Sequence, residues 1–114
     1  MAKQKDEIFA YDDEAWRILG DFTKYAISDH GRVLNLKTGQ FLTGTMTKYG
    51  YVRVQLLQNS VKRCGYIHRM VPEFFMKDYD PCYGIEHVNL DRTDNRIENL
   101  IQTDERRRQS VTFL

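Results

Sequence analysis

One short stretch of the chain concentrates side chains suited to acid–base or metal chemistry. Residues 85–100 read I-E-H-V-N-L-D-R-T-D-N-R-I-E-N-L. His87 has apolar neighbours, as expected near the end of a strand, and a polar turn occupies residues 89–95. Imidazole is close to half-charged at neutral pH, so His87 is suited to act as a general base on water beside a metal-bound phosphate. The pattern fits equally well with a histidine that only forms a hydrogen bond with the turn.

The same stretch resembles the core of HNH endonucleases. Phage and intron-associated members of that family carry an acidic or amide residue followed by histidine, then a polar loop, then N-x-x-x-N-L and a helix. Glu86 and His87 take the place of the pair, and residues 95–100 match the second run as N-R-I-E-N-L. The upstream pattern H-R-x-V-x-x-x-F of the family is present at residues 68–75.

The resemblance implies a ββα-metal core and a role for several residues within it. His87 is the expected catalytic base and Glu86 an expected metal ligand. Asn95 and Asn99 are expected to hold the loop between the two strands. The implied cofactor is a divalent cation such as Mg²⁺ or Mn²⁺.

The position of the second metal ligand is open. In the family this ligand lies in the helix after the second strand, where the present chain reads D-E-R-R-R-Q-S. The expected position falls on Arg106, Arg107 or Arg108, and arginine has no lone pair to offer a cation. Either the ligand has shifted to Asp104 or Glu105, or the site works poorly, or the metal has been lost and the arginines contact phosphate.

Two functions follow from these alternatives. The first is a DNA endonuclease of the HNH type, which nicks or cleaves double-stranded DNA with a divalent metal if the site is intact. The second is a catalytically degenerate, HNH-derived DNA-binding regulator or inhibitor. A protein partner is a further expectation if the site is degenerate, and no small-molecule substrate is expected.

The N-terminal half of the chain predicts a β-rich module. Residues 25–28 and 32–36 are expected to form a hairpin around a turn in which Gly31 can adopt positive φ. Residues 51–57 alternate apolar and polar side chains, and residues 61–67 are expected to return beside them after an Asn-Ser turn.

The first hairpin also resembles the small nuclease-associated DNA-binding module of these endonucleases. The matching run Y-x-x-S-x-x-G-R-V begins at Tyr25 and is preceded by Trp16 and Gly20. We expect Trp16 to belong to the core, because a buried tryptophan usually serves packing. His30 is expected to be a turn residue or a phosphate contact rather than a catalyst.

Two predicted helices complete an α+β architecture. Residues 67–77 place apolar side chains at helical spacing, with Pro72 expected to shorten or bend the helix unless it lies near the first turn. A final helix is expected from Asp104, or from the residue before it, through Phe113. The predicted organisation is an N-terminal arm (1–13), the β-rich module (14–66) and the HNH-like ββα core (67–114).

The distribution of charge favours a nucleic-acid partner, although the net charge is only +1. Residues 22–78 carry a net charge of +6, whereas residues 1–21 carry −3 and residues 79–114 carry −2. A basic middle beside an acidic C-terminal third suits a phosphate-binding surface next to a cation site, here for double-stranded DNA. The expected DNA-binding residues are Arg32, Lys48, Arg53, Lys62, Arg63, Arg106, Arg107 and Arg108.

Composition narrows the class of protein. With 41% hydrophobic residues in 114, the chain is expected to fold as a globular protein with a shallow core. No apolar run approaches the roughly 18 residues of a membrane span, and no signal peptide is evident, so we expect a cytoplasmic protein in a phage-infected bacterial cell. Cys64 and Cys82 lack C-x-x-C companions, which predicts reduced, mostly buried thiols and no structural zinc.

Overall fold

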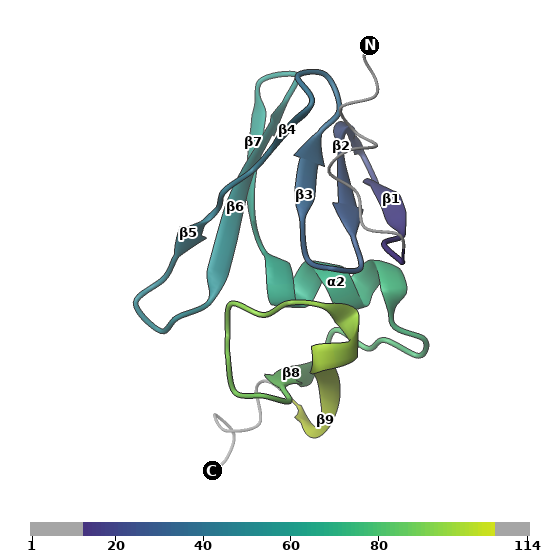
Figure 1. Ribbon diagram of the computed structural model, residues 1–114, viewed down its shortest axis with the longest axis vertical. Helices are drawn as coiled ribbons and strands as arrows, with labels where there is room; N and C mark the ends of the chain where they lie inside the picture. The colour runs from purple at the N-terminus through teal and green to yellow at the C-terminus, as the bar shows by residue number, and fades with distance from the viewer. Residues whose placement is uncertain (1–12, 107–114) are drawn as a thin grey trace.

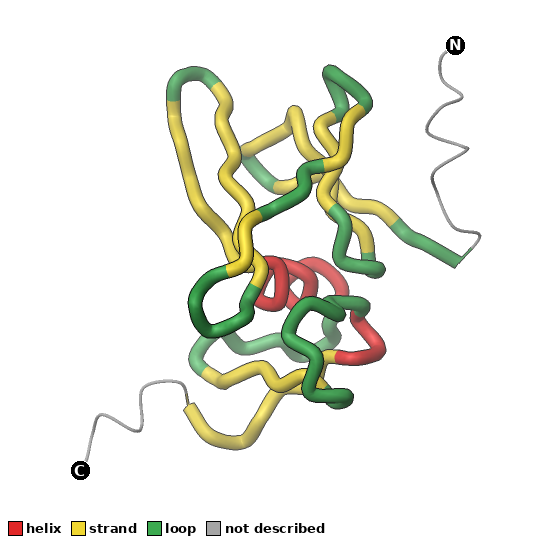
Figure 2. The backbone as a smooth tube through the Cα atoms, turned by 60° about the vertical axis from the view of Figure 1, so that its left-hand side comes forward, coloured by secondary structure: helices red, strands yellow, loops and turns green. Residues whose placement is uncertain are grey.

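A computed structural model describes residues 13–106 of the chain, and Figure 1 shows their arrangement as three small antiparallel sheets and one α-helix. The helix lies between the two larger sheets and a terminal two-stranded sheet (Figure 1). Figure 2 shows the same layering from another side, with the helix at the centre. The expected α+β class is confirmed.

The first sheet contains the predicted hairpin and has the strand order β1-β2-β3-β4. Its central strands pair antiparallel, with Ile27 opposite Val33, and Gly31 in the turn between them has φ +85°. The edge strands were not predicted from the sequence. The strands are β1 (Trp16–Leu19), β2 (Phe22–Ser28), β3 (Val33–Asn35) and β4 (Gln40–Phe41).

The second sheet confirms the predicted alternation and its return strand. It contains β5 (Thr45–Met46), β6 (Val52–Gln58) and β7 (Val61–Tyr66). Val54 and Leu56 are buried, while Arg53, Gln55 and Leu57 are exposed. Asn59 and Ser60 both have positive φ, as the tight turn of a two-residue hairpin requires.

Helix α2 (Ile67–Phe75) begins directly after β7. Its buried face includes Ile67, Met70 and Val71, which recur at helical spacing. Pro72 is the sixth residue of the helix, and because it has no N–H it cannot donate the usual hydrogen bond. The helix ends three residues later, where the Met76 N–H donates to the Pro72 carbonyl at 2.9 Å.

The terminal sheet consists of β8 (Tyr83–His87) and β9 (Leu100–Arg106), with His87 paired opposite Leu100. A short 3₁₀ helix, η1 (Ile97–Asn99), leads into β9. The second of the two strands expected around the loop, which the pattern of Ile97 and Leu100 had predicted to include both residues, therefore begins only at Leu100.

The expected helix start at Asp104 is also wrong. β9 continues to Arg106, which pairs with Tyr83 of β8. A backbone engaged in this ladder cannot at the same time form the first turn of a helix. The rest of the predicted helix, through Phe113, lies outside the described residues.

Two expectations about burial are corrected. Cys64 and Cys82 are exposed free thiols, and Cys64 lies opposite Gln55 on the outer face of the second sheet. Trp16 is only half-buried, because it lies on an edge strand and packs against Phe41 with ring centroids 6.1 Å apart.

A single hydrophobic core joins the sheets, the helix and the terminal hairpin. It continues across residue 66, the expected boundary between module and nuclease core, so the two parts share one packed interior. No helix among residues 13–106 is long and apolar enough to cross a membrane. The core residues are Leu19, Phe22, Tyr25, Ile27, Val33, Val54, Leu56, Ile67, Met70, Val71, Ile85 and Leu100.

Two isoleucines of the first sheet provide a matched test of this core. Ile27 is fully buried, whereas Ile18 on the neighbouring strand is 49% exposed. We expect Ile27→Ala to lower the free energy of unfolding by about 2–5 kcal/mol because it leaves a cavity. Ile18→Ala should change it by no more than about 0.5 kcal/mol. Chemical denaturation measures both values, and equal losses would contradict this core.

Candidate functional site

His87 lies at the end of β8, where its side chain is 6% exposed. Its Nε2 atom is 2.7 Å from Oδ1 of Asn95, which is also buried. An amide oxygen only accepts hydrogen bonds, so Nε2 carries the hydrogen in this pair. The lone pair on Nδ1 is then the proton-accepting position of the neutral ring, as a general base requires.

The loop between β8 and η1 is held by Asn99. Its side-chain oxygen accepts from the Asn89 N–H at 3.0 Å, and its amide nitrogen donates to the Asn89 side chain at 2.9 Å. The same nitrogen donates to the Asp94 carbonyl at 2.8 Å. Because these bonds tie both ends of the loop to one buried amide, Asn95 is carried on a fixed backbone.

Charged contacts stiffen the outer side of this loop. Hydrogen bonds from Arg96 lower the pKa of Asp94 to about 2, and the Asp94 carboxylate in turn raises the pKa of Arg96. Hydrogen bonds from the side chain and backbone of Thr93 lower the pKa of Asp91. Both carboxylates are therefore ionised at neutral pH and already hydrogen-bonded within the loop.

The turn of the first hairpin supports the residue that holds His87. The Ile97 N–H donates to the Asp29 carbonyl at 2.8 Å. A Cβ atom at Gly31 would lie 2.9 Å from both Cβ and the carbonyl oxygen of Asn95. The close approach of these two segments therefore requires glycine at position 31, in addition to its positive φ.

Two further rings lie beside His87. Tyr51 stacks on His68 with centroids 4.4 Å apart, and the two rings are 6.2 and 5.7 Å from the His87 ring, respectively. The Arg92 guanidinium lies 4.6 Å above the Tyr51 ring and donates to the Tyr49 carbonyl at 2.6 Å. Arg92 thereby connects the His87 loop to the second sheet.

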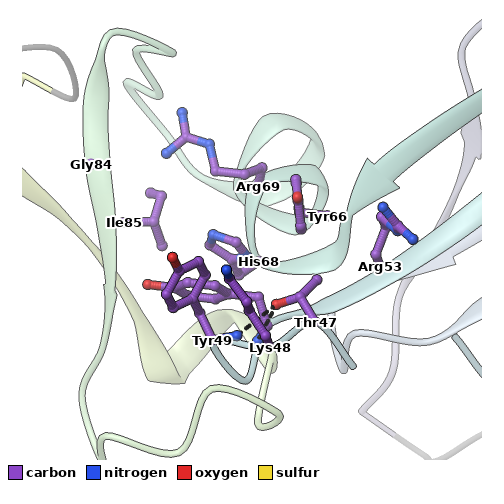
Figure 3. A pocket seen from close by; sticks show the side chains of 10 residues that line it. Thr47, Lys48, Tyr49, Arg53, Tyr66, His68, Arg69, Gly84 and Ile85 are labelled. Carbon is purple, nitrogen blue, oxygen red and sulfur yellow. Dashed lines mark hydrogen bonds between the residues drawn. The ribbon is translucent and has the colours of Figure 1, made fainter. Parts of the chain in front are cut away.

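Two open pockets meet at these rings. One, of about 480 Å³, is lined by His87, Glu86, Leu90 and Arg92 together with Tyr51 and Ile85. The other, of about 770 Å³, shares Tyr51 and Ile85 and extends toward the second sheet. Figure 3 shows this larger pocket, with Lys48, Tyr49 and His68 grouped on one side and Arg53 farther along the sheet.

The residues expected to hold a metal are only partly brought together. Glu86 is exposed and lines the His87 pocket, although successive residues of a strand leave it on opposite faces. Asp104 and Glu105 lie on β9, whose pairing is described but whose side chains at these positions are not. Among the described residues, no group of three histidine, cysteine or acidic side chains forms a metal site. Those residues alone therefore do not fit a complete divalent site.

The expected DNA-binding residues fall into four groups. Lys48, Arg53 and Lys62 are exposed, and the strand register puts Arg53 and Lys62 on the outer face of the second sheet. Arg63 is exposed on the other face, where its guanidinium lies 5.4 Å from the Phe22 ring centre. The Arg32 guanidinium is paired with the carboxylate of Glu14. The side chain of Arg106 is not described, and Arg107 and Arg108 lie outside the described residues.

His30 occupies the hairpin turn, as expected. Its Nε2 atom is 3.1 Å from the Asp13 carboxylate, and its backbone N–H donates to the Ser28 hydroxyl. The ring therefore forms local contacts at the turn and is not part of the cluster around His87.

Sequence reasoning missed Tyr51, His68, Leu90 and Arg92 as members of the site. His68 belongs to the H-R-x-V pattern, which was the only available signal for it. Tyr51 and Arg92 meet through a contact between residues 41 positions apart, and no local pattern reports such a contact.

Comparisons with known proteins found a matching motif and several similar chains. The NUMOD4 motif matches residues 14–57. An uncharacterised HNH endonuclease of Acanthamoeba polyphaga mimivirus is 37% identical over 82 residues, covering 69% of this chain and 20% of its own length. The DNA endonuclease I-HmuI of Bacillus phage SP01 is 28% identical over 76 residues, covering 67% of this chain and 44% of its own length.

A solved structure extends the likeness to the fold. The structure titled "DNA binding and cleavage by the HNH homing endonuclease I-HmuI" superposes with a TM-score of 0.72 at 24% identity. The match covers 78% of this chain and 52% of that one. The chain therefore spans less than half the length of the two sequence relatives and about half of the solved structure.

The contact between Gly31 and Asn95 can be tested with two glycine substitutions. We expect Gly31→Ala to destabilise the protein by about 1–3 kcal/mol through strain at positive φ, and also to displace Asn95. The displacement should alter the NMR signals of the His87 ring.

Gly39→Ala is the control. Gly39 also has positive φ, but an added Cβ there meets no atom within 4 Å. It should therefore cause strain and leave the His87 signals unchanged. Unchanged His87 signals in folded Gly31→Ala would show that the turn does not support Asn95.

Proposed function

Because this chain belongs to the HNH homing-endonuclease-like family, we propose that it binds double-stranded DNA and hydrolyses a phosphodiester bond with His87 as the proton acceptor. The observation that carries the proposal is the buried pair of His87 and Asn95, in which His87 also lines an open pocket. A general base must have a defined tautomer and a route to its substrate, and this arrangement provides both.

The proposed reaction is a hydrolysis. A water molecule gives a proton to Nδ1 of His87 while its oxygen forms a bond to phosphorus, and the bond to one bridging oxygen breaks. The leaving oxygen takes a proton from solvent, and the product is a nicked strand. The Asn95 side-chain oxygen accepts the hydrogen bond from the Nε2–H group throughout, and the amide dipole stabilises the imidazolium that forms.

The family generally uses a divalent metal, and Mg²⁺ or Mn²⁺ is the cation we propose for testing. Glu86 is the single carboxylate among the described residues that line the His87 pocket. One carboxylate holds a hydrated Mg²⁺ weakly unless substrate phosphates complete the coordination. We therefore assign no step of the reaction to a metal held by the described residues.

The second sheet offers a path for the DNA backbone. Lys48 and Arg53 line the larger pocket, which adjoins the His87 pocket through Tyr51 and Ile85. Lys62 lies farther along the same outer face of the sheet as Arg53. Positive side chains spaced along one face suit successive phosphates of one strand.

A second function has a specific observation in its favour. The described residues provide one carboxylate at the pocket, and arginines follow where the family places its second ligand. This supports a catalytically degenerate member that binds DNA without cutting it and acts as a regulator or inhibitor. The same DNA-binding surface serves either function.

One experiment separates these functions. Supercoiled plasmid and phage genomic DNA are incubated with Mg²⁺ or Mn²⁺ and the wild type, His87→Ala or Asn95→Ala, and gel shifts are recorded in EDTA. For the enzyme we expect nicking that falls by about 10²–10⁴-fold in His87→Ala, the usual contribution of a general base. A salt-sensitive shift without nicking would select the regulator. With neither nicking nor a shift, the DNA proposal would be wrong and a protein partner would become the better hypothesis.

The binding surface is tested by a charge comparison. Arg53→Ala combined with Lys62→Ala should weaken DNA binding and reduce the slope of log affinity against log salt by about one for each phosphate that is no longer neutralised. Arg63→Ala is the matched control, because Arg63 is exposed on the opposite face of the same sheet. A larger effect from Arg63→Ala would place the DNA on that opposite face instead.

A further inference from the structure

Leu90 is the most exposed large apolar side chain among the described residues. It is 87% exposed and lies in the loop that follows His87. Val88, two residues earlier, is 58% exposed. Exposed apolar side chains that project beside a candidate catalytic residue are better suited to contacting a partner than to stabilising the free protein.

The backbone at Leu90 is also strained. Its φ is +67°, a region that glycine adopts freely and that a bulky side chain disfavours. The Leu90 N–H donates to the His87 carbonyl at 3.0 Å, and Asn99 holds the preceding Asn89. The surrounding bonds therefore impose the conformation, while the exposed side chain gains little from packing. Glycine would adopt this backbone conformation with less strain in the free protein. The presence of leucine therefore indicates a role outside the stability of the free protein.

The route to His87 passes this side chain. The buried His87 ring opens to solvent through the pocket of about 480 Å³, and Leu90 and Arg92 line it. A phosphate that reaches His87 through this pocket comes close to both residues. The sugars and bases next to that phosphate then meet Leu90.

We propose that Leu90 is an apolar wedge that enters the minor groove beside the scissile phosphate and separates two base pairs. The inference rests on the proposed DNA binding. Leucine is one of the side chains that proteins insert between base steps from the minor groove, where they unstack and kink the duplex. Arg92 follows two residues later, held by Tyr49 and Tyr51, and arginine is suited to the negative potential of a narrow minor groove.

The charges around Leu90 determine how its contribution to DNA binding depends on salt. Asp91 is hydrogen-bonded to Thr93, and Asp94 is paired with Arg96, so the loop has no excess of positive charge. Leu90 itself neutralises no phosphate. Its contribution is therefore apolar and should be nearly independent of salt, in contrast to that of Arg53 and Lys62.

The first measurement is the affinity for a mixed-sequence duplex in EDTA over a range of salt concentrations. We expect Leu90→Gly and Leu90→Ala to weaken binding by about tenfold, because the complex loses the burial of one leucine side chain. The salt slope should stay unchanged. Leu36→Ala, at a leucine 45% exposed in the turn after β3, is the matched control and should bind as the wild type does.

The second measurement reports the wedge directly. Duplexes carrying 2-aminopurine at several positions should gain fluorescence when saturated with the wild type, because unstacked 2-aminopurine is brighter. Saturation with Leu90→Gly should produce no gain. Thermal unfolding checks the fold, and glycine at positive φ should not lower the melting temperature.

Each outcome decides the inference. Weaker binding with an unchanged salt slope and no fluorescence gain in the Leu90 variants supports it. Unchanged affinity and fluorescence in Leu90→Gly overturn it while leaving DNA binding intact. If the wild type binds no duplex, the inference falls together with the proposed function. If Leu90→Gly changes only self-association in sedimentation, the side chain serves contact between copies of this chain and the wedge is wrong.

Discussion

The hydrogen bond between His87 and Asn95 depends on more of the molecule than the two residues that form it. Asn95 keeps its position because Asn99 ties the ends of the loop together and because the first hairpin packs against its backbone. His87 lies on a strand paired to β9 and anchored in the core through Ile85 and Leu100. A defined tautomer at one imidazole thus requires the terminal hairpin, its loop and the N-terminal sheet to be folded together.

The N-terminal sheet therefore has two roles. The NUMOD4 motif matches residues 14–57, which include all four strands of this sheet, and the proposed function makes them part of a DNA-binding module. Its turn at Asp29 and Gly31 also forms part of the support of the His87 loop. The module and the His87 loop are therefore in direct contact through this turn.

Charge and apolar surface are distributed differently around the pocket. Cations line the side toward the second sheet, where Lys48 and Arg53 lie. On the other side, the loop carries Asp94 paired with Arg96, Asp91 hydrogen-bonded to Thr93, and the exposed Leu90. The first side is suited to backbone phosphates and the second to the groove between them.

Sequence alone determined the features that depend on local pattern. The strands of the first hairpin, the alternation in β6, the tight turn at Asn59 and the helix beginning at Ile67 were all predicted, because turn chemistry and side-chain period act over a few residues. Their order and residue types were also enough to recognise the family. Only the tertiary structure showed where the conformation or burial of a residue differs from what the local pattern predicts. Pairing of Arg106 with Tyr83 of β8 extends β9 through residues 104–106, which capping rules had assigned to a helix, and an edge position leaves Trp16 half-buried. The partners of His87 were likewise beyond local reasoning. Contacts between Gly31 and Asn95, and between Tyr51 and Arg92, join residues far apart in the chain, and only packing of the whole core brings them together.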